Sequence, residues 1–142
     1  MDGIIHIKKK LIELESVLPS MLAEVFTEIA SEVEDANILQ LQKGQRGDGS
    51  FLPDYSPASV NRFGKPPGPI RLFDEGDFYR GIILKVFPNG IELQGRDIKT
   101  DMLQHIYGEG ILDLTEESLE RLKQDFVLEL LQEKVERYLL AA

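Results

Sequence analysis

The sequence of 142 residues contains no cysteine. Disulfide scaffolds, zinc sites built on cysteine and cysteine nucleophiles are therefore excluded. Histidine is nearly absent too: His6 and His105 lie far apart, and neither has a carboxylate at the spacing of metal ligands. We expect no metal-binding or catalytic role for either of them, and no cofactor.

Long hydrophobic runs are also missing. No apolar run approaches the roughly 20 residues that span a bilayer. The basic cluster Lys8-Lys9-Lys10 follows a short apolar run, which is the reverse of the order in a signal peptide. The net charge of −9 disfavours a grip on nucleic acid, because such binding depends on Lys and Arg contacts with phosphates. We expect a protein that is soluble in the cell that makes it, with no membrane partner and no sequence-specific nucleic-acid partner.

The length fits one domain over residues 1–142, in which three zones differ in composition. We predict a helical zone over 1–41, an extended loop over 42–69, and a hairpin with C-terminal helices over 70–142. The fold class that these zones predict is α+β.

The first zone has apolar residues at helical spacing: Leu22, Val25, Phe26, Ile29, Val33 and Ala36. Pro19 interrupts this pattern, and proline is costly inside a helix although it is acceptable in the first turn. We therefore predict a kink at Pro19, or two helices over about 5–17 and 19–41.

The second zone is dense in glycine and proline, which defeats regular hydrogen-bond ladders. Structureless loops of this length are uncommon and are usually functional or disordered. This one also carries Phe51, Tyr55 and Phe63, whereas disordered linkers are poor in aromatics. We expect the loop to pack, either on the rest of the chain or only on a partner.

The third zone carries β-forming residues from Phe78 to Phe87, followed by Pro88-Asn89-Gly90 and the alternating run Ile91-Glu92-Leu93-Gln94. Asn-Gly between two such runs indicates a β-hairpin. The first arm could instead begin as a short helix through Gly76–Ile82. Because a two-stranded hairpin alone is marginal, extra strands should come from 70–73, from 111–114, or from a neighbouring subunit.

Two more helices are predicted. A short one covers 98–107, with Met102, Leu103 and Ile106 on one face, and Gly108 ends it. A long one runs from about Thr115, a capping residue, to Leu140. Its apolar stripe, with members Leu119, Leu122, Phe126, Leu130, Val135 and Tyr138, is widened by Val127, Leu131 and Leu139. Two apolar sides on one helix suggest contacts beyond its own domain.

Motifs that could carry chemistry are weak. Asp74, Glu75 and Asp77 could hold a divalent ion, but they flank Gly76 in a turn, where solvated carboxylates are usual. The glycines of 44–49 lack the spacing of a phosphate loop. Arg46-Gly47-Asp48 matches an adhesion tripeptide, for which chance is the better explanation. No serine has an elbow motif around it, so we predict that the protein is not an enzyme.

Two segments of the third zone resemble the virion-morphogenesis, or tail-completion, proteins of tailed phages and prophages. The first segment is Leu72-Phe73-Asp74-Glu75-Gly76-Asp77-Phe78-Tyr79-Arg80-Gly81-Ile82. It is similar to a Leu-x-x-Thr-Gly-x-Leu/Phe-x-x-Ser-Ile motif that leads into strands, with Glu75 in place of Thr and Gly81 in place of Ser. Ile111-Leu112-Asp113-Leu114-Thr115-Glu116-Glu117 is similar to the start of that family's C-terminal helix, and Tyr107-Gly108-Glu109 to the segment before it. Tyr55-Ser56-Pro57 and Lys65 resemble the preceding loop.

This resemblance implies a structural protein of the head–tail junction or tail terminus that forms rings, commonly hexameric, around the DNA channel. It implies contacts with connector and tail-tube proteins, synthesis in the host cytoplasm and a final place in the virion. The predicted interface residues come from the aromatic loop, the first motif and the last helix: Phe51, Tyr55, Phe63, Leu72, Gly76, Phe78, Tyr79, Val127, Leu131 and Tyr138.

Two other functions are kept as alternatives. A cytosolic adaptor or regulatory module would bind a partner helix through the C-terminal stripe and would stay monomeric alone. A small enzyme would use Asp74, Glu75 and Asp77 with a divalent ion, and titration with Mg²⁺ or Mn²⁺ would detect the binding.

Overall fold

Two helices, α1 (Asp2–Glu28) and α2 (Ala30–Gln42), form the N-terminal region. The computed structural model describes the backbone of residues 2–141 and the side chains of residues 8–141, so the side chain of His6 lies outside the described residues. Of the two predictions for Pro19, a kink or a break into two helices, the break is wrong, because α1 continues through Pro19 as one helix. Pro19 has no N–H to donate to the carbonyl of Glu15. Both residues are exposed, so that carbonyl can be hydrated instead.

The interruption lies instead at Ile29, which has φ −103° and ψ 18°. Helical hydrogen bonds continue across it, from Ile29 N to Val25 O (3.0 Å) and from Val33 N to Ile29 O (3.1 Å). Just before the interruption, the Thr27 hydroxyl donates to the carbonyl of Ala23 at 2.8 Å. Such back-bonds to the fourth preceding residue often bend helices.

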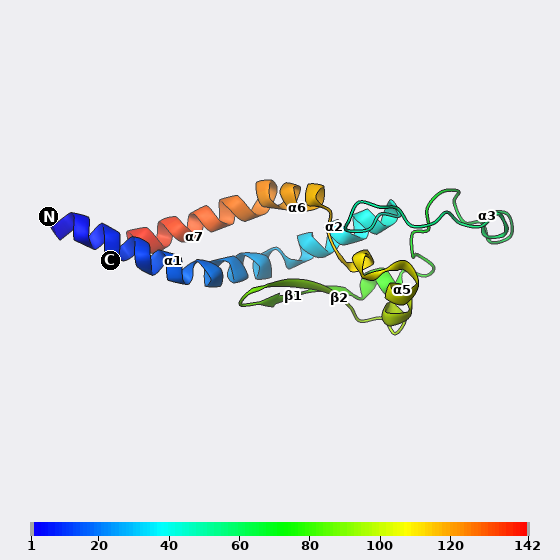
Figure 1. Cartoon of the computed structure of the whole chain (residues 1–142), viewed down its shortest axis with the longest axis horizontal. Coiled ribbons are helices and arrows are strands. Elements are labelled where there is room, and N and C mark those ends of the chain that lie inside the picture. The colour runs from blue at the N-terminus through cyan, green and yellow to red at the C-terminus, as the bar shows by residue number, and fades with distance from the viewer. Residues whose placement is uncertain (1, 142) are drawn as a thin grey trace.

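The first and last helices lie side by side and form an elongated arm (Figure 1). The last helix, α7 (Leu128–Leu140), runs back along α1, so that the ends of the chain lie at the same end of the molecule. Lys134 binds Glu24 (3.2 Å) and Glu28 (2.9 Å) across the two helices. Nearer the free end, Lys10 Nζ lies 4.4 Å from the centre of the Tyr138 ring.

A β-hairpin lies beneath the helices, with strands β1 (Ile82–Phe87) and β2 (Gly90–Gly95) in antiparallel register. A short helix, α4 (Asp77–Arg80), precedes β1, as the alternative prediction had it. Phe87 pairs with Gly90, so Pro88 and Asn89 occupy the turn, rather than Asn89 and Gly90. Neither Asn89 nor Gly90 has a positive φ, and the fixed φ of Pro88 suits the first central position of an ordinary turn instead.

The sheet has two strands, and residues 70–73 and 111–114 add none to it. The hairpin is stabilised by the helices instead. Leu84 and Leu93 pack on an apolar cluster from the helices, and the Glu34 carboxylate accepts a hydrogen bond from the Leu84 amide at 2.7 Å. That bond occupies part of the edge of β1 next to α2.

The next helix, α5 (Thr100–Tyr107), ends at Gly108 as predicted, and the 3₁₀ helix η1 (Glu109–Leu112) follows. Met102, Leu103 and Ile106 do not share one buried face. Leu103 packs on the core, while Met102 and Ile106 are exposed.

The C-terminal helix begins at α6 (Glu116–Leu122), passes through a π-helical turn, η2 (Lys123–Val127), and continues as α7. The predicted cap is confirmed, because the Thr115 hydroxyl accepts a hydrogen bond from the Ser118 amide at 3.1 Å. Two buried clusters hold the elements together. One lies among the loop, α4, β1 and η1, and the other lies between α1–α2 and α6–η2; Leu93 packs against both.

Candidate functional site

Two buried side chains of α2 hold the segment that leads into α6. Gln40 is 3% exposed; its Nε2 donates to the carbonyl of Asp113 (2.8 Å) and its Oε1 accepts from the amide of Thr115 (3.0 Å). The Asn37 Nδ2 donates to the carbonyls of Ile111 (3.1 Å) and Asp113 (3.2 Å). Because buried polar groups are costly to leave unpaired, these bonds fix the start of α6 against α2.

The π turn η2 changes which side chains of the last helix face inward. Leu122 and Val127 are both buried, and they lie five residues apart, which is the repeat of one π turn. An uninterrupted α-helix would bury Phe126, which follows Leu122 by four residues, and the apolar stripe predicted from the sequence includes Phe126 for that reason. Phe126 is instead 36% exposed. The π turn therefore presents an aromatic ring on the surface, and π turns are frequent at functional sites.

A groove of about 310 Å³ lies between α2 and α6–η2, and we call it the α2–α6 groove. Its apolar lining includes Leu39, which is 57% exposed, and Phe126. Charged side chains surround them: Glu32, Asp35, Lys43, Glu117, Arg121 and Asp125. Arg121 pairs with Glu117 at 3.3 Å, whereas Glu32, Asp35 and Asp125 have no ion pair within the described part of the chain. The groove thus combines apolar side chains with an excess of acids, four carboxylates against the two cations Lys43 and Arg121.

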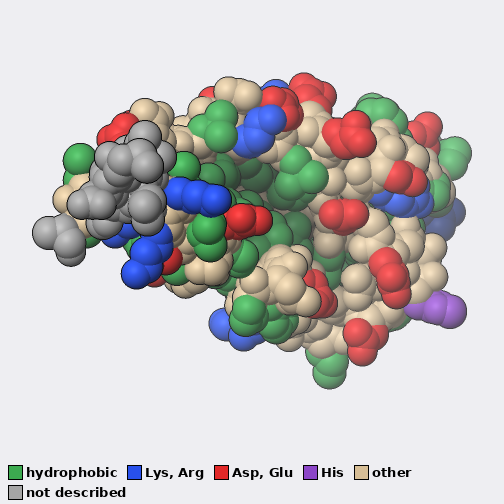
Figure 2. Space-filling view, turned by 60° about the vertical axis from the view of Figure 1, so that its left-hand side comes forward, with side chains coloured by type: hydrophobic (Ala, Val, Ile, Leu, Met, Phe, Trp, Pro, Cys, Tyr) green, Lys and Arg blue, Asp and Glu red, His purple; other side chains and the backbone are tan. Residues whose placement is uncertain are grey.

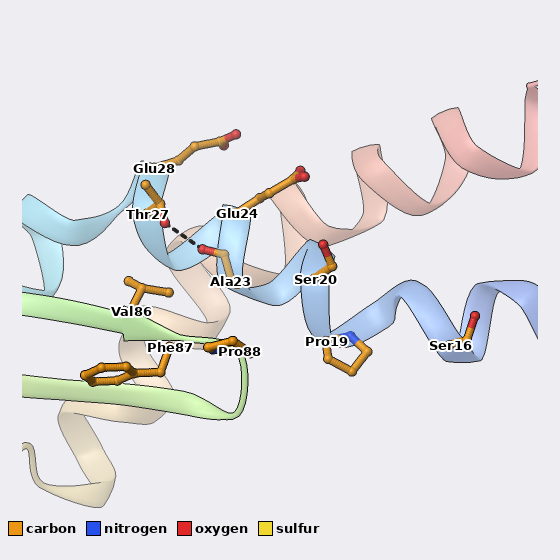
Figure 3. A pocket seen from close by; sticks show the side chains of 10 residues that line it. All are labelled: Ser16, Pro19, Ser20, Ala23, Glu24, Thr27, Glu28, Val86, Phe87 and Pro88. Atoms are coloured by element: carbon orange, nitrogen blue, oxygen red, sulfur yellow. Dashed lines mark hydrogen bonds between the residues drawn. The ribbon is translucent and has the colours of Figure 1, made fainter.

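A second, more open groove of about 740 Å³ lies between α1 and the tip of the hairpin (Figure 3). Val86 and Phe87 line it from the hairpin, and Pro19 from α1. Glu24 and Glu28 also border it, but Figure 3 shows them directed away from the hairpin. Lys134 binds both of them, and their carboxylates raise the pKa of its ammonium group.

Two further cavities, of about 440 and 220 Å³, share Phe26 and Ile91 and extend from the hairpin toward α6. Figure 2 shows hydrophobic side chains gathered in a hollow on one face of the molecule, with acidic side chains spread over the surface around it. Apolar recesses with polar surroundings mark interaction sites in many proteins.

The long loop is ordered and ends in a projecting tip, residues 56–67, which contains helix α3 (Pro57–Phe63) (Figure 1). A neck of paired backbone carries the tip, with hydrogen bonds from Tyr55 N to Gly68 O (2.9 Å) and from Ile70 N to Pro53 O (2.8 Å). No residue of α3 is buried. Before the neck, Leu52 is buried in the core, so the loop packs on its own chain at its base and leaves its tip exposed.

The neck is fixed to the body through Arg71. The Tyr79 hydroxyl donates to the Arg71 carbonyl, and the Tyr55 hydroxyl accepts from the Arg71 amide at 3.1 Å. Burial raises the pKa of Tyr79 to about 12, so the hydroxyl stays protonated and keeps donating up to a higher pH than an ordinary tyrosine would. Next to it, Leu72 has φ +53°, a strained conformation for a residue other than glycine.

The ten predicted interface residues divide into three groups. Phe51 and Phe63 are exposed, and the second group is partly buried: Tyr55, Leu72, Leu131 and Tyr138. The third group is buried: Gly76, Phe78, Tyr79 and Val127. These four support the fold from inside and offer no surface to a partner, so we remove them from the candidate interface. The signal that misled the prediction is the apolar character that core and interface residues share.

Asp74, Glu75 and Asp77 do not converge. Asp77 pairs with Arg80, and Asp74 lies 3.9 Å from Lys65 Nζ, on the side of the tip. Among the residues that the structure describes, no group of three or more His, Asp or Glu side chains is arranged to hold a metal ion. His105 is exposed on α5.

The Arg46-Gly47-Asp48 tripeptide has a role within the chain. The Arg46 guanidinium donates to the carbonyls of Tyr107 (2.6 Å) and Phe51 (2.9 Å). Asp48 accepts hydrogen bonds from the Ser50 amide (2.9 Å) and hydroxyl (2.5 Å), which lower its pKa. The three residues form a turn that attaches the base of the loop to the segment after α5.

No helix within residues 2–141 has the length and the apolar character needed to cross a membrane. Comparison with protein-family models, with curated proteins and with solved structures gives no match to this chain.

Proposed function

We propose that this chain is a structural and assembly protein of a tailed-phage virion, placed at the head–tail junction or the tail terminus. It acts by forming a ring around the DNA channel through protein–protein contacts, with neighbouring connector and tail-tube proteins as its other partners. The resemblance of residues 72–82 and 111–117 to the tail-completion proteins supports this, as does the order of the elements, from a long helix through a loop and hairpin to a last helix.

One observation carries the proposal: each chain has a projecting tip at one end and separate apolar grooves elsewhere (Figure 1). A closed ring of identical subunits needs heterologous contacts, in which two different surfaces of the same chain meet. A chain that exposes a protruding surface and a distinct recess meets that requirement.

The charge distribution suits a protein that surrounds DNA without gripping it. Residues 11–42, which cover most of α1 and α2, contain seven acidic residues and no basic residue. A surface of this kind facing a channel repels phosphates, so that passing DNA is not retained. A ring whose lumen proves strongly basic would contradict this part of the proposal.

The test is the size and symmetry of the purified full chain. Light scattering coupled to size-exclusion chromatography, together with electron microscopy, should show a closed ring at high protein concentration. Replacing residues 56–67 with Asn-Gly should leave the fold intact, since the neck residues Tyr55 and Gly68 are already hydrogen-bonded neighbours. We expect this variant to keep its helical circular dichroism and to lose the ring. A wild-type chain that stays monomeric at all concentrations would refute the proposal.

A cytosolic adaptor remains the second candidate, because the last helix exposes Leu128, Leu139 and Leu140. An amphipathic partner helix could pack along this side of α7. A chain that is monomeric alone and forms a one-to-one complex with a helical partner would favour this function over the ring.

A further inference from the structure

We infer that Arg62 and Phe63 at the loop tip dock into the α2–α6 groove of a second copy of the chain. The inference rests on the proposed function, because it assigns the two different surfaces that join neighbouring subunits in the ring.

The tip has the chemistry of an inserting element. Phe63 is 75% exposed at the end of α3, and Arg62 beside it has no hydrogen bond or ion pair to any described residue. Residues 55–73 contain three basic residues, Arg62, Lys65 and Arg71, and no acidic one, although the whole chain has a net charge of −9. An aromatic ring next to an arginine is the combination enriched at the energetic centres of protein interfaces.

The groove has the complementary chemistry. Leu39 and the ring of Phe126 offer exposed apolar surface for Phe63, in a recess of about 310 Å³. Asp35 and Asp125 lie on the two helices that border it, and neither is paired with a cation within residues 8–141. Arg62 would therefore meet unneutralised carboxylates next to an apolar surface, where exclusion of water strengthens the attraction.

The neighbouring hairpin groove is a poorer receptor for the tip. Its two carboxylates, Glu24 and Glu28, are already held by Lys134 and point away from its apolar wall (Figure 3). It is also larger, at about 740 Å³, and more open, so a single aromatic side chain would leave it partly filled.

A second copy is the occupant that the charges favour over nucleic acid. The basic tip stands beyond the rest of its own molecule, which places it to contact another one (Figure 1). Every other copy offers the acidic helices α1 and α2, with seven acids and no base over residues 11–42. The three basic residues of 55–73 make a weak site for DNA, because the chain as a whole carries a net charge of −9 and repels phosphates.

The test compares variants of the full chain that alter one surface at a time. The tip variant is Arg62→Glu/Phe63→Ser, and the groove variant is Asp35→Lys/Asp125→Lys. The control variant, Lys85→Glu/Ile98→Ser, makes similar changes at exposed positions outside both surfaces. Sedimentation and light scattering measure association, and thermal unfolding establishes that each variant is folded. We expect the tip and groove variants each to weaken association by about tenfold or more, and the control to leave it unchanged.

Mixing the variants gives a sharper readout. The tip variant keeps an intact groove and the groove variant keeps an intact tip, so an equimolar mixture should form one-to-one complexes, while each variant alone stays monomeric. Combining Arg62→Glu with the groove variant in one chain should restore association in part, by exchanging the charges. Raising the salt from about 0.1 to about 1 M should weaken the wild-type contact, since the screening length falls from about 10 to 3 Å.

The outcomes separate this inference from the proposed function. If the wild type forms rings and both variants form them equally well, the inference is wrong and the ring stands. If the wild type stops at two copies and both variants disrupt that pair, the docking is supported and the ring is refuted. Fluorescence anisotropy with a DNA duplex completes the set: DNA binding that the tip variant abolishes, without any change in association, would assign the tip to nucleic acid and overturn the inference.

Discussion

Replacing Gln40 with alanine should destabilise the chain more than any single hydrogen bond would suggest. The Gln40 side chain is buried and bridges two backbone groups with its two shortest hydrogen bonds, to the carbonyl of Asp113 (2.8 Å) and the amide of Thr115 (3.0 Å). Two longer bonds join it to the carbonyl of Gln45 (3.5 Å) and the hydroxyl of Ser118 (3.4 Å). Alanine removes all four bonds at once, and the two short ones dominate the loss. The carbonyl of Asp113 retains a second donor in Asn37, but the structure gives the amide of Thr115 no other partner.

The magnitude follows from that difference. Losing a bond from a carbonyl that keeps another donor costs about 1 kcal/mol, and leaving an amide without a partner costs about 1–3 kcal/mol. The free energy of unfolding should therefore fall by about 2–4 kcal/mol. In a domain of this size each kcal/mol corresponds to about 2–4 °C, so the melting temperature should fall by roughly 5–15 °C.

The assay is urea unfolding followed by circular dichroism, with Gln42→Ala as the matched control. Gln42 is exposed and makes no side-chain hydrogen bond in the described chain, so its replacement should change the stability by less than about 0.5 kcal/mol. The slope of the unfolding free energy against urea should be the same for both variants. If Gln40→Ala were as stable as Gln42→Ala, the bridge would carry no energy, and the account of how α6 is held against α2 would be wrong.

Three further predictions test other parts of the structure. In the same assay, Val127→Ala should lower the free energy of unfolding by about 2 kcal/mol and Phe126→Ala by much less, because Val127 is buried and Phe126 is not. A continuous α-helix, in which Phe126 would be the buried residue, would reverse that order. Burial raises the pKa of Tyr79 from 10.0 to about 12. Its contribution to the free energy of unfolding is therefore full below about pH 10 and is lost as the pH rises through 12. Tyr79→Phe should remove this part of the fall in unfolding free energy when unfolding is measured at increasing alkaline pH. Glu34→Ala should cost about 1–2 kcal/mol because it removes the partner of an edge amide of β1, and Asp35→Ala, at an exposed neighbouring position, should be close to neutral.

The features that could be predicted from sequence are those set by local patterns. Apolar spacing predicted the long helices, the capping residue Thr115 predicted the start of α6, and Gly108 predicted the end of α5. The β-forming runs on either side of Pro88-Asn89-Gly90 predicted the hairpin. Each depends on residues close in the chain, where backbone preference and side-chain chemistry act together.

The features that could not be predicted depend on tertiary contacts or on a change of helical register. Pro19 is tolerated because it lies on an exposed side of α1, and the distortion between α1 and α2 lies at Ile29, where helical hydrogen bonds nevertheless continue. The π turn moves Phe126 to the surface and Val127 into the core, which no α-helical period could anticipate. For this reason the α2–α6 groove, which needs both Phe126 and the distant Leu39, had no signal in the sequence alone.

The adjacency of the chain ends at the free end of the arm has a practical consequence. The last turns of α7 lie beside residues 10–13 of α1, at the opposite extreme of the molecule from the loop tip (Figure 1). A dye or an affinity tag attached at either end would stand well clear of the tip and the α2–α6 groove. Energy transfer between donor- and acceptor-labelled chains could then follow subunit exchange in real time, without the label blocking the contact that it reports.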